Sequence, residues 1–319
     1  MNNARPPFDP ELEAVVEAIT SSAPATLTAD MIPELRQVAM PGSSRSAVED
    51  RGLVARDVAV TSYDGTEIVL SVIQRPERTG AGPCIYYIHG GGMVMGDRWN
   101  GVLGLAEWTQ RLNAVIVTVE YRLAPEYPDP IPVEDCYAGL VWTADHSEEL
   151  GIDPGRLMVA GASAGGGLAA GTALLARDRQ GPALCAQLLM CPMLDDRDST
   201  VSTVQFDGAG TWSRGSNATG WTALLGERRG SENVSIYAAP ARAADVAGLP
   251  PTYIDCGSAE VFRDEDVAYA TSIWSAGGQA ELHVWAGGFH GFDVFAPDSR
   301  VSSQAVATRN NWIARVLGA

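Results

Sequence analysis

The residues best suited to chemistry lie in a segment of small side chains, Gly161-Ala162-Ser163-Ala164-Gly165. It follows a β-branched run, Leu157–Gly161, and precedes a segment with helical periodicity, Leu168–Ala176. A serine at such a strand-turn-helix junction is turned outward on a strained backbone, and the residues two places away on either side must be small. We therefore expect Ser163 to be a nucleophile, with the first N–H groups of the helix facing a developing oxyanion.

The same region also fits a dinucleotide-binding pattern, G-x-G-x-x-A, as Gly165-Gly166-Gly167-Leu168-Ala169-Ala170. That pattern requires an acidic residue at the end of the next strand, where it binds the ribose hydroxyl. The next apolar run, Leu184–Met190, is uncharged. The sequence thus disfavours a nucleotide site.

A second cluster, His89-Gly90-Gly91-Gly92, comes at the end of another apolar run. Consecutive glycines let a backbone pass close to a ligand with its N–H groups facing inward, as an oxyanion hole requires. Alone, the cluster would also be typical of a flexible turn. Beside a nucleophilic serine, it predicts an oxyanion hole.

A serine nucleophile needs a general base, and the chain has four histidines. His89 belongs to the glycine cluster, His146 to a polar helical segment and His283 to a strand, so we expect structural or surface roles for them. His290 follows the last strand in a glycine-rich loop. Because a parallel sheet places reactive groups at the carboxyl ends of its strands, His290 is the predicted base.

The third member of such a triad is a carboxylate that orients the imidazole. Four candidates come near the preceding strand, namely Asp255, Glu260, Asp264 and Glu265. Asp255 lies inside the strand, and Asp264 and Glu265 fall in the first turn of the next helix, where the helix dipole favours acidic residues. Glu260 lies in the loop and is free to orient His290.

The chain order Ser163, Glu260, His290 agrees with the order nucleophile, acid, base of α/β hydrolases. The sequence has no H-E-x-x-H motif and no Cys/His cluster at ligand spacing. We therefore expect no metal site and no cofactor.

The elements that position these residues follow from hydrophobic periodicity. Two strands that alternate in polarity are joined by a hairpin signal, Tyr63-Asp64-Gly65, and about six buried strands follow, separated by segments of helical length. The eight ranges are Val54–Thr61, Glu67–Gln74, Cys84–His89, Val115–Glu120, Leu157–Gly161, Cys185–Cys191, Thr252–Cys256 and Glu281–Trp285. They predict an α/β fold with a mostly parallel sheet covered by helices on both faces.

Two segments fall outside this alternation. Residues 1–50 contain two expected helices, Pro10–Ser22 and Thr28–Met40, ahead of any strand. The segment Asp195–Leu249 is rich in Gly, Ser and Trp and contains no clear strand. Insertions of this length in a compact domain are usually functional loops or small subdomains.

Composition excludes several classes of function. All 22 basic residues are arginine, against 39 acidic residues, for a formal net charge of -17 over 319 residues. Without lysine the chain cannot form a Schiff base, a Ser-x-x-Lys nucleophile or a G-x-x-x-x-G-K-[ST] phosphate loop. The negative charge disfavours binding to nucleic acids and to anionic membranes.

The apolar runs and the cysteines indicate the cellular compartment in which the protein is expected. No apolar run approaches the roughly 20 residues that span a bilayer, and residues 1–10 contain no signal core, so we expect a cytoplasmic protein without membrane insertion. The five cysteines are an odd number without a C-x-x-C pair. We expect them to be reduced core residues.

Together these motifs resemble the hormone-sensitive-lipase family of bacterial carboxylesterases. The residues that carry the resemblance are His89–Gly92, Tyr121–Glu126, Gly161–Gly165, Arg263–Glu265 and His290–Phe292. It implies an α/β-hydrolase catalytic domain over residues 51–319, with a helical cap formed by residues 1–50 and an insertion at about 195–249.

The resemblance also implies roles for the loops. The oxyanion would be held by the N–H groups of Ala164 and of two glycines, Gly91 with either Gly90 or Gly92. The segment Tyr121–Glu126 would brace the glycine cluster.

Some positions depart from the family pattern. Glu260 stands where Asp is more frequent, which puts the identity of the acid in doubt rather than the reaction. Ala162 and Met93 replace an Asp or Thr and an aromatic residue, which would alter the pocket lining. Met93 and three residues of the insertion, Phe206, Trp212 and Trp221, could line a substrate pocket or form the cap's own core.

The main hypothesis is a metal-free serine esterase that cleaves small or short-chain acyl esters, including lactones, through an acyl-enzyme on Ser163. An amidase or deformylase with the same triad is the second, because the motifs do not distinguish them. A non-hydrolytic small-molecule receptor is the third, although such relatives typically lose a triad residue and none is missing here. Assembly into a homo-oligomer stays open.

Overall fold

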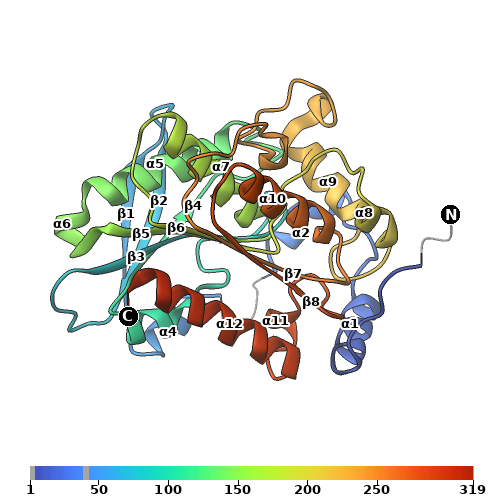
Figure 1. Ribbon diagram of the computed structural model, residues 1–319, viewed down its shortest axis with the longest axis horizontal. Coiled ribbons are helices and arrows are strands. Elements are labelled where there is room, and N and C mark those ends of the chain that lie inside the picture. Colours follow the sequence, from blue (N-terminus) through green and yellow to red (C-terminus); the bar gives the residue numbers. More distant parts are fainter. Residues whose placement is uncertain (1–3, 39–42, 319) are drawn as a thin grey trace.

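Eight strands form one sheet in the computed structural model, which describes residues 4–38 and 43–318 (Figure 1). The strands are β1 Val54–Thr61, β2 Glu67–Gln74, β3 Gly82–Ile88, β4 Val115–Glu120, β5 Ile152–Ala162, β6 Ala186–Met190, β7 Thr252–Gly257 and β8 Ala280–Trp285. Their order is β1-β2-β4-β3-β5-β6-β7-β8. β2 pairs antiparallel with β1 and β4, and all other neighbours are parallel. The predicted mostly parallel eight-stranded sheet is therefore confirmed.

Two strands differ from their expected form. β5 begins at Ile152 rather than Leu157, because beyond a register shift Ile152 still pairs with Gly82 of β3. β8 is half exposed rather than buried, because it is the edge strand and has a neighbour on one side only. The hairpin turn is as expected, with the N–H of Gly65 donating to the carbonyl of Ser62 at 3.0 Å.

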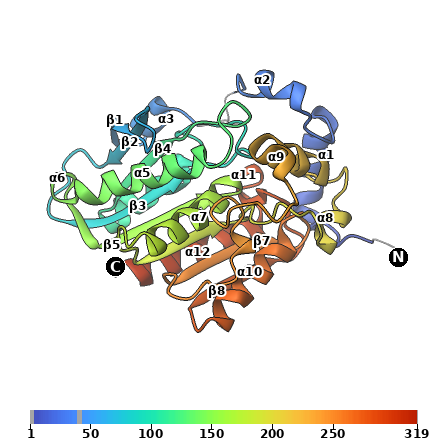
Figure 2. The same ribbon diagram turned by 90° about the horizontal axis from the view of Figure 1, so that it is seen from above.

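Helices cover both faces of the sheet (Figures 1 and 2). One face carries α5 Ile131–Asp145, α7 Ala164–Asp178 and α10 Arg263–Ser275, and the other carries α4 Val102–Leu112 and α12 Arg300–Leu317. Each face of the sheet has its own hydrophobic core, and the side chains of successive strand residues point into the two cores alternately. In β3, Tyr86 belongs to the first core, and Ile85 and Tyr87 belong to the second. Burial of both faces explains the apolar runs of the central strands.

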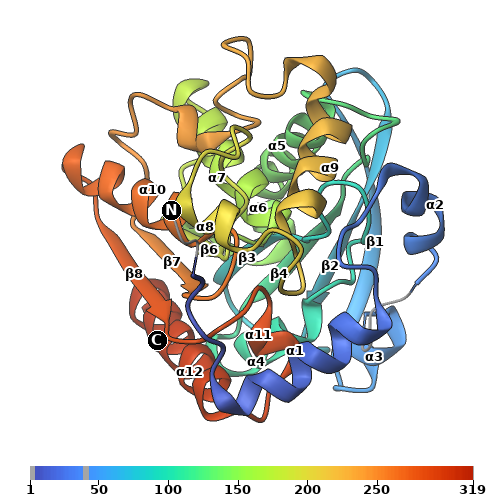
Figure 3. The same ribbon diagram turned by 90° about the vertical axis from the view of Figure 1, so that its right-hand side faces the viewer.

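Of the two segments predicted to form a cap, residues 10–35 and 201–225 lie at the same end of the molecule, whereas residues 45–49 lie beside β1 and α4 (Figures 2 and 3). The first contains α1 Pro10–Ser22, a 3-10 turn at Ala29–Met31, α2 Ile32–Leu35 and α3 Arg45–Glu49, and the second contains α8 Val201–Gln205, α9 Arg214–Leu225 and 3-10 turns at Gly226–Arg228 and Pro240–Arg242. They contact each other through Leu27, whose N–H donates to Ser216 Oγ at 2.9 Å and whose carbonyl accepts from Thr219 Oγ1 at 2.7 Å.

The first expected N-terminal helix has the expected bounds, but the second is wrong in length. α1 is capped by Asp9, whose side chain accepts from the N–H of Glu11 at 2.8 Å. The expected helix Thr28–Met40 is reduced to a 3-10 turn and the four residues of α2, and Met40 lies outside the described residues. After Leu35 the backbone continues in i to i+3 turns, with the N–H of Val38 donating to the carbonyl of Leu35 at 3.1 Å. The Arg36 side chain donates to the carbonyls of Val94 and Ala124.

The remaining short helices are α6 Ser147–Leu150, which follows α5, and α11 Phe292–Phe295, which follows β8. α11 and the loop before it pack against α1, where Leu12 and Val16 contact Phe289 and Phe292. The N-terminal segment therefore covers the loop that contains His290.

Candidate active site

Ser163 connects β5 directly to α7 and has the strained backbone expected of a nucleophile elbow. Its φ and ψ are 57° and -123°, and its N–H donates to the carbonyl of Met190 in β6 at 2.8 Å. The flanking glycines are required by space: a Cβ on Gly161 would lie 2.1 Å from the Gly165 oxygen, and one on Gly165 would lie 2.2 Å from the Ile88 oxygen. The close contacts of strand and helix thus force Ser163 outward.

His290 lies between Ser163 and Glu260. Its Nε2 is 2.9 Å from Ser163 Oγ, and its Nδ1 is 3.0 Å from Glu260 Oε2. His290 comes from the β8–α11 loop and Glu260 from the β7–α10 loop, both at the carboxyl ends of parallel strands. Phe262 packs edge-on against the imidazole, with ring centroids 5.1 Å apart, which fixes the plane of the ring. The structure therefore brings together the three residues expected to form a triad.

Glu260 is fully buried, whereas 12% of the His290 side chain is exposed. Burial raises the pKa of the Glu260 carboxyl, and the adjacent His290 opposes the shift. Oε1 of Glu260 is buried and has no hydrogen-bond partner among the described residues. The negative charge of the buried Glu260 carboxylate is therefore stabilised by His290.

The competing carboxylates have other partners. Asp264 accepts from the N–H of Ser202 at 2.8 Å, and Glu265 accepts from the N–H groups of Leu194 at 2.7 Å and Asp195 at 3.1 Å. Asp255 pairs with a buried arginine of α12. The structure separates these three from His290.

The glycine cluster lies against the serine elbow. A Cβ on Gly90 would be 2.9 Å from the Ala162 oxygen and 3.3 Å from Ser163 Cβ, so only glycine allows this approach. Within the described part of the chain, nothing accepts a hydrogen bond from the N–H groups of Gly90, Gly91, Gly92 or Ala164. Unpaired backbone N–H groups beside a serine, as at Gly90 and Ala164, can stabilise an oxyanion.

Comparison with known proteins places the chain in a family. A protein family described by its α/β hydrolase fold matches residues 85–294, which is more than half of the chain. The chain belongs to this family.

Similar proteins specify the class of enzyme. Carboxylesterase NlhH of Mycobacterium tuberculosis is 32% identical over 303 residues, which cover 92% of this chain and 91% of NlhH. Among solved structures, a bacterial heroin esterase matches with a TM-score of 0.89 and 38% identity over 98% of both chains. The esterase LipW of Mycobacterium marinum matches with a TM-score of 0.86 and 31% identity over 100% of both chains. This α/β hydrolase is thus a serine carboxylic-ester hydrolase, and the resemblance to hormone-sensitive-lipase-like carboxylesterases is confirmed.

The predicted pocket residues of this esterase differ in where they lie. Trp212 packs on the glycine cluster, where a Cβ on Gly92 would be 2.5 Å from its Cη2. Met93 continues the cluster and is fully buried. Phe206 and Trp221 are also fully buried, and Phe206 lies beside the N-terminal Phe8, with ring centroids 6.5 Å apart. The structure therefore brings two of the four to the glycine cluster.

The other histidines of the esterase have structural contacts. His89 stacks on Tyr121 with ring centroids 4.2 Å apart, and its Nδ1 lies 2.7 Å from the carbonyl oxygen of Gly90. Burial lowers the pKa of His89, which favours its neutral form. His146 Nδ1 contacts the carbonyl of Trp142 at 2.8 Å, and His283 pairs with Glu281 in β8.

The segment Tyr121–Glu126 contacts the glycine cluster, as the resemblance implied. Tyr121 Oη donates to the carbonyl of His89 at 3.0 Å, and the N–H of Ala124 donates to the carbonyl of Met93 at 2.9 Å. Arg36 extends this support, because it bonds to Val94 just beyond the cluster as well as to Ala124. Arg36 was not predicted to have this role, since nothing near it in the chain indicates a partner so far away.

The structure also bears on two further expectations, which concern the cysteines and membrane-spanning helices. All five cysteines, which lie within the described residues, are free, as expected. Among the helices of residues 4–38 and 43–318, none has the length and apolar character needed to cross a membrane.

Proposed function

We propose that this esterase hydrolyses small or short-chain acyl esters through an acyl-enzyme on Ser163, with His290 as general base and Glu260 as the residue that orients it. The observation that carries the proposal is the position of His290, with Nε2 2.9 Å from Ser163 Oγ and Nδ1 3.0 Å from Glu260 Oε2. Both distances lie within the range for proton transfer and hydrogen bonding.

The first half of the reaction forms the acyl-enzyme. Ser163 Oγ attacks the ester carbonyl carbon while His290 Nε2 takes the hydroxyl proton. The carbonyl oxygen becomes an oxyanion and accepts hydrogen bonds from the N–H groups of Ala164 and Gly91, together with Gly90 or Gly92. Loss of one such donor typically costs about a hundredfold to a thousandfold in kcat. His290 then gives its proton to the departing alcohol.

The second half releases the acid. A water molecule attacks the acyl carbonyl while His290 Nε2 removes one of its protons and passes it to the departing Ser163 Oγ. The carboxylic acid that forms loses its remaining proton to solvent. Glu260 accepts the Nδ1–H bond throughout, which keeps Nε2 toward Ser163 and compensates the imidazolium. Apart from the substrate and this water, each step uses side chains and backbone N–H groups of this chain.

The experiment that tests the proposal compares Ser163→Ala with Ser303→Ala, a change at an exposed serine of α12. We expect Ser163→Ala to lower kcat on a p-nitrophenyl ester by several orders of magnitude and to abolish labelling by a fluorophosphonate, while circular dichroism shows an intact fold. Ser303→Ala should behave as the wild type. Near-normal turnover by Ser163→Ala would contradict the acyl-enzyme, and a wild type that neither labels nor turns over would favour the receptor hypothesis.

We further infer that residues 1–50 and about 195–249 form a cap over a catalytic domain of residues 51–319. The contact of Leu27 with α9 and the contact of Trp212 with Gly92 support this division. A cap so close to the glycine cluster favours compact acyl groups over long chains. Activity across p-nitrophenyl esters of increasing chain length would test it, and a maximum on long-chain esters would contradict it.

The ester, lactone and amide alternatives share this geometry and require parallel assays. An amide leaves as a poorer leaving group, so its hydrolysis depends more strongly on proton donation by His290. A matched panel of acyclic esters, lactones and anilides should show ester cleavage as the fastest reaction. The panel should include heroin, for which one similar esterase is named. Comparable rates on anilides would favour the amidase hypothesis.

Two expectations about the whole protein are also carried forward as proposals. We propose a cytoplasmic location, which the free cysteines support because reduced thiols are typical of that compartment. Cell fractionation tests it.

Assembly into a homo-oligomer can be measured by light scattering, and the triad described above is complete within one chain.

A further inference from the structure

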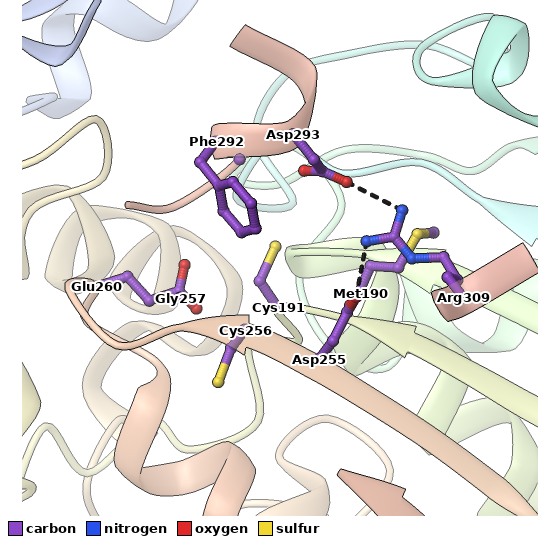
Figure 4. A pocket seen from close by; sticks show the side chains of 10 residues that line it. Met190, Cys191, Asp255, Cys256, Gly257, Glu260, Phe292, Asp293 and Arg309 are labelled. Atoms are coloured by element: carbon purple, nitrogen blue, oxygen red, sulfur yellow. Dashed lines mark hydrogen bonds and ion pairs between the residues drawn. The ribbon is translucent and has the colours of Figure 1, made fainter. Parts of the chain in front are cut away.

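A cysteine lies beside the triad. Cys191 directly follows β6 and has a positive φ of 38°, and its N–H donates to the carbonyl of Asp255 at 2.6 Å. Figure 4 shows its side chain between Glu260 and the group formed by Arg309, Asp255 and Asp293. The strained backbone at the end of β6 therefore directs a thiol to the buried side of the catalytic carboxylate.

This thiol belongs to a compact set of possible metal ligands. The possible ligand atoms, one each from Cys191, Glu260 and His290, lie within 4.8 Å of one another. The three residues come from three separate loops at the carboxyl ends of β6, β7 and β8. No local spacing in the sequence could have indicated this cluster.

The donor set suits a thiophilic divalent cation. Thiolate, imidazole and carboxylate bind Zn²⁺ at about 2.0–2.3 Å in tetrahedral geometry, which places ligand atoms roughly 3.3–3.8 Å apart. Closing the cluster around an ion therefore requires side-chain shifts on the order of 1 Å. Glu260 can contribute Oε1, which is buried and has no partner among the described residues.

The charges also balance. Burial raises the pKa of the Cys191 thiol well above its usual value, and the nearby Glu260 carboxylate adds to the shift, so a bare thiolate is costly here. A divalent cation compensates the thiolate and the carboxylate together. Arg309 does not cancel this attraction, because its own charge is matched by Asp255 and Asp293, each 2.9 Å away.

A small cavity adjoins the cluster. It has a volume of about 10 Å³ and is lined by Cys191, Glu260, Asp293 and Arg309, among others. This is close to the space that one water molecule requires, and a water is the common fourth ligand of an open zinc site.

We propose that Cys191, Glu260 and His290 form a binding site for Zn²⁺ or Cd²⁺, and that its occupation inhibits the esterase. The ion replaces the thiol proton of Cys191, which goes to solvent, and binds Glu260 and Nδ1 of His290. The proton that Nδ1 carried passes through solvent to Nε2, and Nε2 then no longer accepts the proton of Ser163. The inhibition rests on the proposed triad, whereas binding of the ion does not.

Binding is tested first in the inactive Ser163→Ala protein, so that it does not depend on catalysis. Cd²⁺ is titrated into chelator-treated protein, and the ultraviolet charge-transfer absorption of the cadmium–thiolate bond is recorded. We expect about one bound Cd²⁺ per chain. Adding Cys191→Ala should remove the absorption, whereas adding Cys185→Ala should retain it, because Cys185 lies before β6 and outside the cluster. Equal absorption in both double variants would overturn the site.

Inhibition is tested next with Ser163 in place. Zn²⁺ should reduce ester hydrolysis, chelation should restore it, and Mg²⁺, which prefers oxygen ligands, should have no effect. Relative to its own metal-free rate, Cys191→Ala should require at least about tenfold more Zn²⁺ for half-inhibition. Equal sensitivity of Cys191→Ala and the wild type would overturn the proposal. If no esterase activity exists at all, the proposed function fails while the cadmium titration still decides the site.

Discussion

Glu260 contacts His290 through one carboxylate oxygen only. Oε2 lies 3.0 Å from Nδ1 of the imidazole, while Oε1 is buried and has no partner among the described residues. A shorter acid in this loop would need a different backbone path to reach the imidazole, so the extra methylene of glutamate matches the position of the loop. Glu260 therefore holds Nδ1 of His290 by a single hydrogen bond, which the carboxylate accepts.

This arrangement predicts unequal effects for two neighbouring carboxylates. Glu260→Ala should lower kcat about a thousandfold or more, because the imidazole loses the group that fixes its tautomer. Asp264→Ala should change kcat by only a few-fold, because Asp264 bonds to Ser202 at the start of α8 and not to His290. Steady-state kinetics on one p-nitrophenyl ester would check both. The reverse ranking would show that Glu260 is not the catalytic acid.

The sequence predicted those parts of the site that have a local signature. The glycine elbow, the triple glycine and the position of His290 after the last strand each depend on a few adjacent residues and on strand periodicity. Contacts between distant residues were not predictable in this way. In the sequence, Cys191 resembles the other apolar core residues and Arg36 resembles an ordinary helical residue. Only folding brings each of them close to its distant partners.

The same distinction explains the errors in the fold. The bounds of β1, β2 and β4 follow from alternation or continuous burial, which the sequence displays directly. The helix expected to reach Met40 ends at Leu35, and the Arg36 side chain just beyond it bonds to the distant residues Val94 and Ala124, which helical periodicity does not indicate. The exposure of β8 depends on its place at the sheet edge, and topology alone determines that place.

Two glycines should respond in opposite ways to alanine. Gly161→Ala should reduce the free energy of unfolding by more than about 2 kcal/mol and abolish activity, because its Cβ would meet the Gly165 oxygen at 2.1 Å. Gly104→Ala in α4 should add about 0.5–1 kcal/mol, since its Cβ meets nothing within 4 Å and alanine favours a helix. Urea unfolding would measure both. A well-folded, active Gly161→Ala protein would contradict the close contact at the elbow.

Arg309 of α12 should be more important for stability than Arg315 of the same helix. Arg309 is buried and pairs with Asp255 in β7 and with Asp293, three residues after His290, each at 2.9 Å. Arg309→Met leaves the buried carboxylate of Asp255 and the half-buried carboxylate of Asp293 without their cation and should cost about 3–5 kcal/mol. Because Asp293 is also released, kcat should fall more than KM changes.

Arg315→Met is the matched control. The Arg315 side chain is 61% exposed and pairs with Glu281 at the surface, so its loss should cost about 0–1 kcal/mol and leave kcat unchanged. Thermal and urea unfolding of the two variants would be compared at one pH. Equal losses of stability would show that the buried ion pairs with Asp255 and Asp293 contribute no more than a surface pair.

Asp266 predicts a distinctive dependence of stability on pH. Its side chain is fully buried in α10, and both carboxylate oxygens lack partners among the described residues. Burial raises the pKa of Asp266 well above its usual value, and the carboxylates of Glu260 and Glu265 add to the shift. The folded protein therefore keeps a proton that the unfolded chain releases above about pH 4.

Because unfolding releases this proton, rising pH should favour the unfolded state by up to about 1.4 kcal/mol per pH unit, until the raised pKa in the folded protein is passed. Asp266→Asn removes this contribution. Relative to the wild type, the variant should therefore gain stability as the pH rises above about 4, until the raised pKa of Asp266 is passed, and show no such trend below about pH 4. Urea unfolding across this range would measure the difference, with Asp298→Asn at an exposed site as the control. A difference between Asp266→Asn and the wild type that stays constant with pH would mean that Asp266 is ionised in the folded protein.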